Sequence, residues 1–372
     1  MSVLDDPLAA ALQIYAPLSR ASAAGALANQ THAVPKARRW LLSQRADFWF
    51  ASAGASAGLL AALAMIVLYG DRELDWLDLV LSELHLGATY DAIVRRRLWR
   101  RLPVDVLVVP LAILVATYAL MASGQSVLLT SIAMYAAIWH RGRQSFGIAR
   151  FYQGRAGGPI SRLHSWLFAG AIYLPMAAAT FLYCHLSPEK YEGDPYYAIR
   201  AGTELTLGLS VIASVWVGVY LVWTLRQTQQ QRQSNVGQTR KLETLHPGER
   251  WVVLAHAVAF GSAYVLGATN ASFLLVLVVH HEVQYLYFSY AMARWPMAAH
   301  KQENLKVGNR QSEIRFAASF ALWPLIGLAG ALGSGWYQFE WLAPLGVGGL
   351  FCHYWLDGRI WTRRSMAADA LA

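Results

Sequence analysis

The chain has 372 residues, of which 56% are hydrophobic and only 14% are charged, with 31 Lys and Arg against 22 Asp and Glu. This composition excludes an ordinary soluble domain and indicates an integral membrane protein. Two cysteines, Cys184 and Cys352, lie in apolar runs, which excludes a disulfide framework and a cysteine-based zinc site. We expect no signal peptide, because the first long apolar run starts near Phe48, after a basic segment.

Apolar runs of about twenty residues, the length that crosses a bilayer, predict an all-α polytopic helix bundle with ten spans. The spans cover 47–69, 77–94, 103–122, 126–143, 164–186, 203–225, 250–268, 271–291, 314–333 and 340–358. The second has an alternative as an interfacial or re-entrant helix, because it carries several ionisable side chains. The chain then divides into an N-terminal tail (1–46), a transmembrane domain (47–362) and a C-terminal tail (363–372).

The basic residues are distributed unequally about these spans. If the N-terminus is cytoplasmic and all ten segments cross, every Lys and Arg faces the cytoplasm except Arg72, Lys190 and Arg200. Cytoplasmic loops of membrane proteins carry such an excess, so the pattern predicts cytoplasmic N- and C-termini in a bacterial inner membrane. It also excludes nucleic acid as a partner, because the basic residues follow the topology and form no single patch.

Histidines recur within the predicted spans. Six of the eleven lie there: His85, His140, His256, His280, His281 and His353. All but His256 are on spans that run from outside to inside, at mid-membrane or in its inner half. On each of these four spans a histidine is followed four residues later by a hydrogen-bonding group: His85 by Thr89, His140 by Gln144, His280 by Gln284 and His353 by Asp357. That spacing puts both groups on one helix face, so we interpret each pair as a metal ligand with its orienting group.

These residues predict a histidine-rich metal centre. Imidazole and carboxylate donors favour non-haem iron, mononuclear or dinuclear, with copper or zinc next. We expect His85, His140, His281 and His353 as ligands, with His280 and Glu282 close behind. The expected orienting groups are Thr89, Asp91, Gln144, Gln284, Tyr285 and Asp357.

The HHE triplet at 280–282 leaves one assignment open. Neighbouring side chains on a helix point about 100° apart, so one of His280 and His281 faces away from the centre. Gln284 favours pairing with His280, and Tyr285 could equally orient His281. His256 has no such partner four residues later and is not assigned to the site.

Three functions use these residues. The first is oxidation of a hydrophobic or lipid-like substrate by an iron centre that uses dioxygen, with an electron-donor protein as partner; burial suits this chemistry because it excludes water. The second is electron transfer by a b-type haem held between two histidines. The third is a proton-coupled transporter or a binding protein without catalysis, although the prolines within spans lack the symmetry expected of broken transporter helices.

Four segments, HLGATYDAIVRR, WHRGRQSFGIARFY, HHEVQYLYF and HYWLDGRIW, resemble a group of bacterial polytopic membrane proteins that largely lack an assigned function. The shared blocks are His-x-x-x-Thr, His-x-x-x-Gln-x-x-Gly, His-x-x-Gln-Tyr and His-Tyr-x-x-Asp, in this order, over residues 77–361. The resemblance implies a polytopic fold and no known reaction. The His-x-x-x-His and His-x-x-His-His boxes of membrane desaturases are missing, which argues against that superfamily.

Overall fold

The computed structural model describes residues 40–52, 54–69, 75–156, 160–191, 194–234, 245–293 and 343–361, and three isolated residues between 314 and 322. All of these belong to one compact unit, Arg39–Ala372. The predicted tails at 1–46 and 363–372 lie almost entirely outside the described residues.

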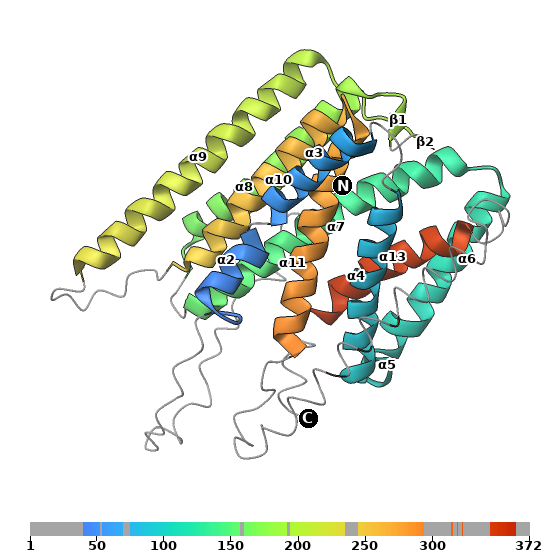
Figure 1. Ribbon diagram of the computed structural model, residues 1–372, viewed down its shortest axis with the longest axis horizontal. Helices are drawn as coiled ribbons and strands as arrows, with labels where there is room; N and C mark the ends of the chain where they lie inside the picture. Colours follow the sequence, from blue (N-terminus) through green and yellow to red (C-terminus); the bar gives the residue numbers. More distant parts are fainter. Residues whose placement is uncertain are drawn as a thin grey trace, which may run out of the picture. The chain divides into compact units, whose positions relative to one another are not determined.

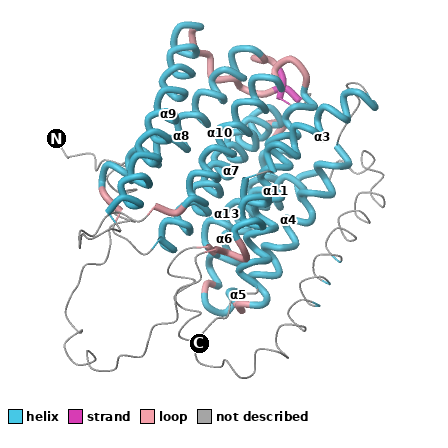
Figure 2. The backbone as a smooth tube through the Cα atoms, turned by 60° about the vertical axis from the view of Figure 1, so that its left-hand side comes forward, coloured by secondary structure: helices cyan, strands magenta, loops and turns pink. Residues whose placement is uncertain are grey.

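The described part of the chain is almost entirely helical (Figure 1). Its α-helices are α2 (Gln44–Ser52), α3 (Gly54–Tyr69), α4 (Asp75–Arg95), α5 (Leu98–Arg101), α6 (Val109–Ala122), α7 (Ser126–Ala156), α8 (Arg162–Leu186), α9 (Thr203–Ser234), α10 (Pro247–Gly267), α11 (Leu275–Ala293) and α13 (Ala343–Ile360). A π-helical turn, Val104–Val108, leads into α6, and a 3-10 turn, Ala271–Leu274, leads into α11. The strands β1 (Lys190–Tyr191) and β2 (Asp194–Pro195) form a small antiparallel hairpin, drawn in magenta in Figure 2.

Five of the described helices are long and apolar enough to cross a membrane. They run over Val104–Ala122, Arg162–Leu186, Thr203–Gln230, Pro247–Gly267 and Ala271–Met292. α2 and α3 add a sixth if they form one span bent by 44°. These six coincide with six of the predicted spans and indicate a membrane protein.

Three further predicted spans are helical but less apolar. They correspond to α4, α7 and α13, each of which carries a histidine and charged side chains in its central or C-terminal part. The remaining predicted span, 314–333, lies outside the described residues except for its isolated positions.

The helices pack in two neighbouring groups. α8 lies against both α9 and α10, while α11 contacts α3, α4 and α7, and α13 contacts α4, α6 and α7 (Figures 1 and 2). Glycine permits the close approach of α3 to α11, because a Cβ at Gly58 would lie 2.7 Å from the Val276 carbonyl oxygen. Small residues allow this kind of contact between membrane helices.

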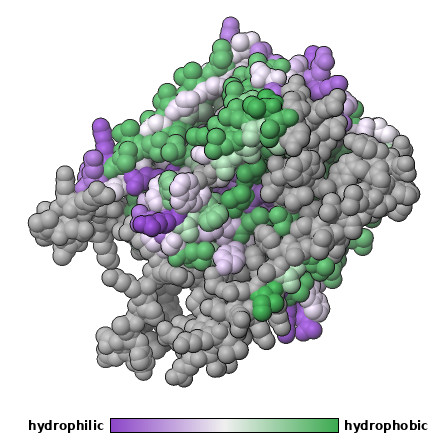
Figure 3. Space-filling model, viewed as in Figure 1, coloured by the Kyte–Doolittle hydropathy of each residue, from purple (hydrophilic) through white to green (hydrophobic). Residues whose placement is uncertain are grey.

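Apolar side chains cover the outer faces of several helices. α9 alone exposes eight large aliphatic residues: Leu205, Leu207, Val211, Ile212, Val215, Val219, Val222 and Leu225. Figure 3 shows hydrophobic residues over much of the face that carries α3 and α9. A water-soluble protein rarely exposes so large an apolar surface, whereas lipid tails would cover it.

Two buried carboxylates outside the histidine cluster are held by hydrogen bonds. Asp47 accepts from the backbone N–H groups of Leu41 (2.8 Å) and Leu42 (3.1 Å) and from the hydroxyls of Tyr152 (2.8 Å) and Tyr287, which fixes the start of α2 against α7 and α11. Burial and the Asp47 carboxylate raise the pKa of the Tyr152 hydroxyl, which therefore remains a donor.

Glu249, at the start of α10, is the second of these carboxylates. One of its oxygens lies 2.7 Å from His164 Nε2 on α8, and it accepts from the Tyr220 hydroxyl of α9 at 2.7 Å. These contacts connect α8, α9 and α10 in the membrane-length part of the fold.

Candidate metal centre

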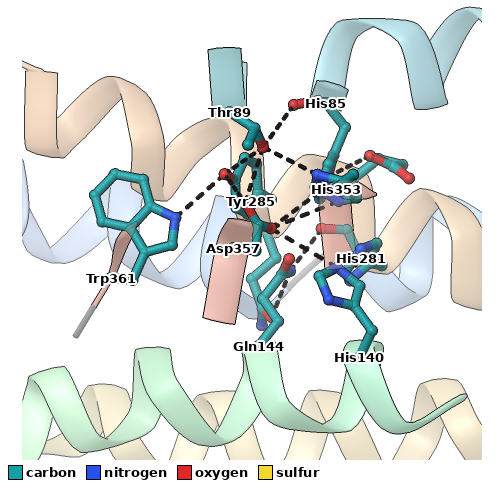
Figure 4. Close-up of polar contacts among 11 residues, drawn as sticks. His85, Thr89, His140, Gln144, His281, Tyr285, His353, Asp357 and Trp361 are labelled. Atoms are coloured by element: carbon teal, nitrogen blue, oxygen red, sulfur yellow. Dashed lines mark hydrogen bonds and ion pairs between the residues drawn. The ribbon is translucent and has the colours of Figure 1, made fainter. Parts of the chain in front are cut away.

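Four histidines from four different helices meet in the interior. His85 of α4, His140 of α7, His281 of α11 and His353 of α13 each offer a ring nitrogen, and these nitrogens all lie within 4.8 Å of one another. All four side chains are buried, and their rings lie edge-on or stacked on one another (Figure 4). Four imidazoles this close are near enough to hold a metal ion, and neutral imidazole is the commonest metal ligand in proteins.

A carboxylate lies beside three of these histidines. Asp357 Oδ2 lies 3.5 Å from Nε2 of His85, 3.7 Å from Nε2 of His140 and 3.5 Å from Nε2 of His353. Ligands bound at about 2.0–2.1 Å to one ion are about 3–4 Å apart, so this carboxylate oxygen is close enough to the three nitrogens to bind the same ion.

The same atoms lack hydrogen-bond partners. Within the described part of the chain, none is found for Nε2 of His85, His140 or His353, or for Asp357 Oδ2. A buried polar atom without a partner is costly, and several that converge on one point mark a place for a ligand.

Asp357 is held in place through its other oxygen. Oδ1 accepts hydrogen bonds from the Thr89 hydroxyl at 2.8 Å and from the Tyr285 hydroxyl at 2.6 Å. The Thr89 oxygen also lies 3.1 Å from His353 Nδ1. Because the hydroxyl proton of Thr89 goes to Asp357, we assign the proton in that contact to His353 Nδ1, which leaves the Nε2 lone pair facing the cluster.

Glu282 orients His85 from outside the cluster. Its Oε2 lies 2.5 Å from His85 Nδ1, the ring nitrogen that faces away from Asp357. A carboxylate on the far nitrogen of a ligating imidazole fixes the tautomer and makes the near nitrogen a better donor. Glu282, which the sequence placed close behind the four expected ligands, thus contacts the cluster through His85.

The orienting contacts run between helices. Gln144, expected to orient His140, donates to the backbone carbonyl of His281 at 2.8 Å. Gln284 donates to the Ala51 carbonyl at 3.0 Å and accepts from Ser145 at 3.3 Å. Thr89 contacts His353 and donates a hydrogen bond to Asp357. The spacing of four residues marked the right helix faces. Of the predicted same-helix pairs, His353 and Asp357 are in contact at 3.5 Å. The side chains of Thr89, Gln144 and Gln284 instead contact groups on neighbouring helices.

The structure separates the two histidines of the HHE triplet. His281 belongs to the cluster, and its ring is stacked on that of His85 with centroids 4.7 Å apart. His280 is not part of the group of four and packs against α3, where a Cβ at Gly54 would lie 3.6 Å from His280 Nδ1. His256 lies elsewhere, with Nε2 3.0 Å from the Ile172 carbonyl oxygen.

Other aromatic and acidic groups differ from expectation. Tyr285, expected beside His281, stacks on His85 with centroids 3.8 Å apart and binds Asp357. Asp91 pairs with Arg95 at 3.2 Å, near the end of α4. Sequence reasoning missed Tyr354, whose ring stacks on His140, and Trp361, whose indole N–H donates to the Tyr285 hydroxyl at 3.2 Å. Their only signal was position: both lie within the HYWLDGRIW segment.

Four imidazole nitrogens thus converge in a buried interior, and one carboxylate oxygen lies near three of them. Such a set can hold a divalent metal ion of borderline hardness, and the aromatic rings around it limit the access of water. Comparison with protein-family models, with curated proteins and with solved structures finds no match to this chain.

Proposed function

We propose that this chain is a membrane-embedded oxidoreductase of the oxygenase type, with one non-haem iron ion held by His85, His140, His281, His353 and Asp357. One observation carries the proposal: Asp357 Oδ2 lies 3.5–3.7 Å from three buried imidazole nitrogens, and none of these atoms has a hydrogen-bond partner among the described residues. Iron bound there would supply reversible one-electron chemistry and activation of dioxygen.

The number of donors favours iron over zinc. Zinc takes four ligands in structural sites and three protein ligands in catalytic ones. Five donors would exceed both numbers, whereas a six-coordinate ion could accept all five and one further ligand. An open position is what dioxygen chemistry at non-haem iron requires.

The carboxylates favour a single ion over a pair. A dinuclear centre needs carboxylates that reach both metals, as in di-iron helix bundles. Asp357 Oδ1 is already bound by Thr89 and Tyr285, and Glu282 lies on the far side of the His85 ring. Neither carboxylate is therefore placed to bridge two metal ions.

The packing of the rings also favours an ion over a haem. A b-type haem needs a flat slot between two opposed imidazoles. In this cluster the rings of His85 and His353 lie 4.3 Å apart, centroid to centroid, and those of His140 and His353 lie 4.9 Å apart. A porphyrin would have to separate them.

The setting favours a lipid-soluble substrate. The centre is buried among helices whose outer faces are apolar, so a hydrophobic molecule dissolved in the bilayer meets the protein without entering water. We further propose ten spans with both termini on the cytoplasmic side of a bacterial inner membrane. The charge asymmetry, with only Arg72, Lys190 and Arg200 on the outer side, supports this topology.

Metal analysis and absorption spectroscopy of detergent-purified protein test the proposal. We expect about one iron per chain and no Soret band, and we expect His353→Ala to lose the metal because it removes one of the converging nitrogens. His256→Ala is the matched control: it removes an equally buried histidine whose ring binds a backbone carbonyl, and it should retain the metal.

The outcomes separate the alternatives. A Soret band with stoichiometric haem would support the electron-transfer protein instead. Protein that is folded but holds no metal, and that binds none when supplied with ferrous iron, would contradict the metal centre and leave transport or binding without catalysis. Equal metal loss in the His353 and His256 variants would show that the metal is not held where we propose.

A further inference from the structure

Tyr285 contacts two members of the proposed centre, Asp357 and His85. Its hydroxyl donates to Asp357 Oδ1 at 2.6 Å, and its ring lies on the His85 imidazole with centroids 3.8 Å apart at an angle of 23°. The same phenol thus touches two of the five donors, one through a hydrogen bond and the other through ring stacking. Its side chain is almost fully buried.

A hydrogen-bonded path leads from Tyr285 to the end of α13. The indole N–H of Trp361, which directly follows α13, donates to the Tyr285 hydroxyl oxygen at 3.2 Å. Trp361 is partly exposed, and in the proposed topology it lies near the cytoplasmic face, where a soluble electron carrier would dock. Tyr285 therefore stands between the protein surface and the centre.

We propose, resting on the redox function proposed above, that Tyr285 is a one-electron relay for the metal centre. A phenol is readily oxidised only when its proton can leave at the same time, so a base at hydrogen-bond distance is required. Asp357 Oδ1, at 2.6 Å, is that base. The stacked His85 ring would give the electron a short path to a metal ion held by the cluster.

Oxidation of Tyr285 sends its electron and its proton to different acceptors. Dioxygen, reduced at the centre, is the oxidant, and a one-electron carrier protein is the reductant. The O–H bond of Tyr285 breaks, its electron passes to the centre, and its proton forms an O–H bond at Asp357 Oδ1. When the carrier delivers an electron, the proton returns from Asp357 and the phenol is restored.

A neighbouring cation favours oxidation of Tyr285 over oxidation of Trp361. The guanidinium carbon of Arg96 lies 5.7 Å from the centre of the Trp361 ring. A cation over the indole face opposes loss of an electron from that ring, because the oxidised indole would be positive as well. Oxidised Tyr285 is neutral once its proton has moved, and the Trp361 N–H stabilises its oxygen.

Rapid-freeze electron paramagnetic resonance tests the relay. Protein loaded with ferrous iron is mixed with dioxygen, and we expect a tyrosyl radical whose signal narrows when the tyrosines carry ring deuterium. Tyr285→Phe should bind the same amount of iron, since Thr89 still holds Asp357, but should give no such radical.

Two further variants separate a relay from a positioning role. Trp361→Phe should keep the radical and shift its g-tensor, because the hydrogen bond to the phenol oxygen is lost. Tyr354→Phe removes the phenol that stacks on His140 at 4.4 Å, and it should keep the radical unchanged.

Each of these experiments has a result that would overturn the relay. A radical that persists in Tyr285→Phe, or that disappears in Tyr354→Phe alone, overturns the relay. So does wild-type protein that holds iron and consumes dioxygen without forming any tyrosyl radical. Wild-type protein that binds no iron overturns the proposed function itself, and the relay with it.

Discussion

Replacing Glu282 by Gln isolates the contribution of one carboxylate to metal binding. Glu282 Oε2 lies 2.5 Å from His85 Nδ1, in an interior where both side chains are almost fully buried. The amide keeps the size of the side chain but loses the charge that makes His85 Nε2 a strong donor. Loss of such an outer partner weakens metal binding about 10–100-fold. That range corresponds to about 1.4–2.7 kcal/mol of binding free energy.

Competition with a chromophoric chelator for ferrous iron measures this change directly. Glu249→Gln is the matched control, because Glu249 is an equally buried carboxylate 2.7 Å from a histidine nitrogen, His164 Nε2, outside the cluster. We expect the affinity of the control to stay at the wild-type value. An unchanged affinity in Glu282→Gln, or equal losses in both variants, would refute the role that we assign to Glu282.

Three further predictions concern the scaffold. Gly58→Ala would place a Cβ 2.7 Å from the Val276 carbonyl oxygen, so we expect thermal unfolding to show a loss of about 1–3 kcal/mol of stability. Gly147→Ala is the control: its Cβ would have no atom within 4 Å, and we expect no loss of stability. Asp47→Asn should lower the unfolding temperature through weaker hydrogen bonds at the start of α2, worth about 1–3 kcal/mol, with full metal content retained. Glu189→Cys should react with an impermeant thiol reagent added from outside the cell, and a variant that does not react would contradict the proposed topology.

The membership of the cluster could be predicted from the sequence. A membrane interior tolerates buried imidazoles only where they pair or bind something, so His85, His140, His281 and His353 stood out in apolar surroundings. Similar depth on four predicted spans then suggested one site, and the structure brings the four together. The choice between His280 and His281 needed the rotation of α11 about its axis, which the sequence does not specify.

The contacts within the centre were harder to predict. A spacing of four residues shows only that two side chains share a face, and it does not reveal which neighbouring helix that face meets. Thr89 therefore contacts His353 and Asp357, 264 and 268 positions away, and takes no part in orienting the ring of His85. Asp357 was assigned an orienting role for the same reason, although its Oδ2 lies near the ring nitrogens of His85, His140 and His353.

The predicted spans succeeded where the helices are uniformly apolar. α8, α9 and α10 are both long and apolar enough to cross a membrane, whereas α4, α7 and α13 do not combine the two properties. These last three helices supply His85, His140 and His353, together with charged neighbours such as Arg141 and Asp357. The polar groups that build the centre thus reduce the hydropathy signal by which a span is recognised.

X-ray absorption spectroscopy at the K-edge of the bound metal tests the centre most directly. In detergent-purified protein we predict nearest neighbours of the metal that are nitrogen and oxygen donors at about 2.0–2.2 Å, with multiple scattering from several imidazoles. A first shell containing sulfur, or one without imidazole scattering, would contradict the assignment of His85, His140, His281 and His353 as ligands.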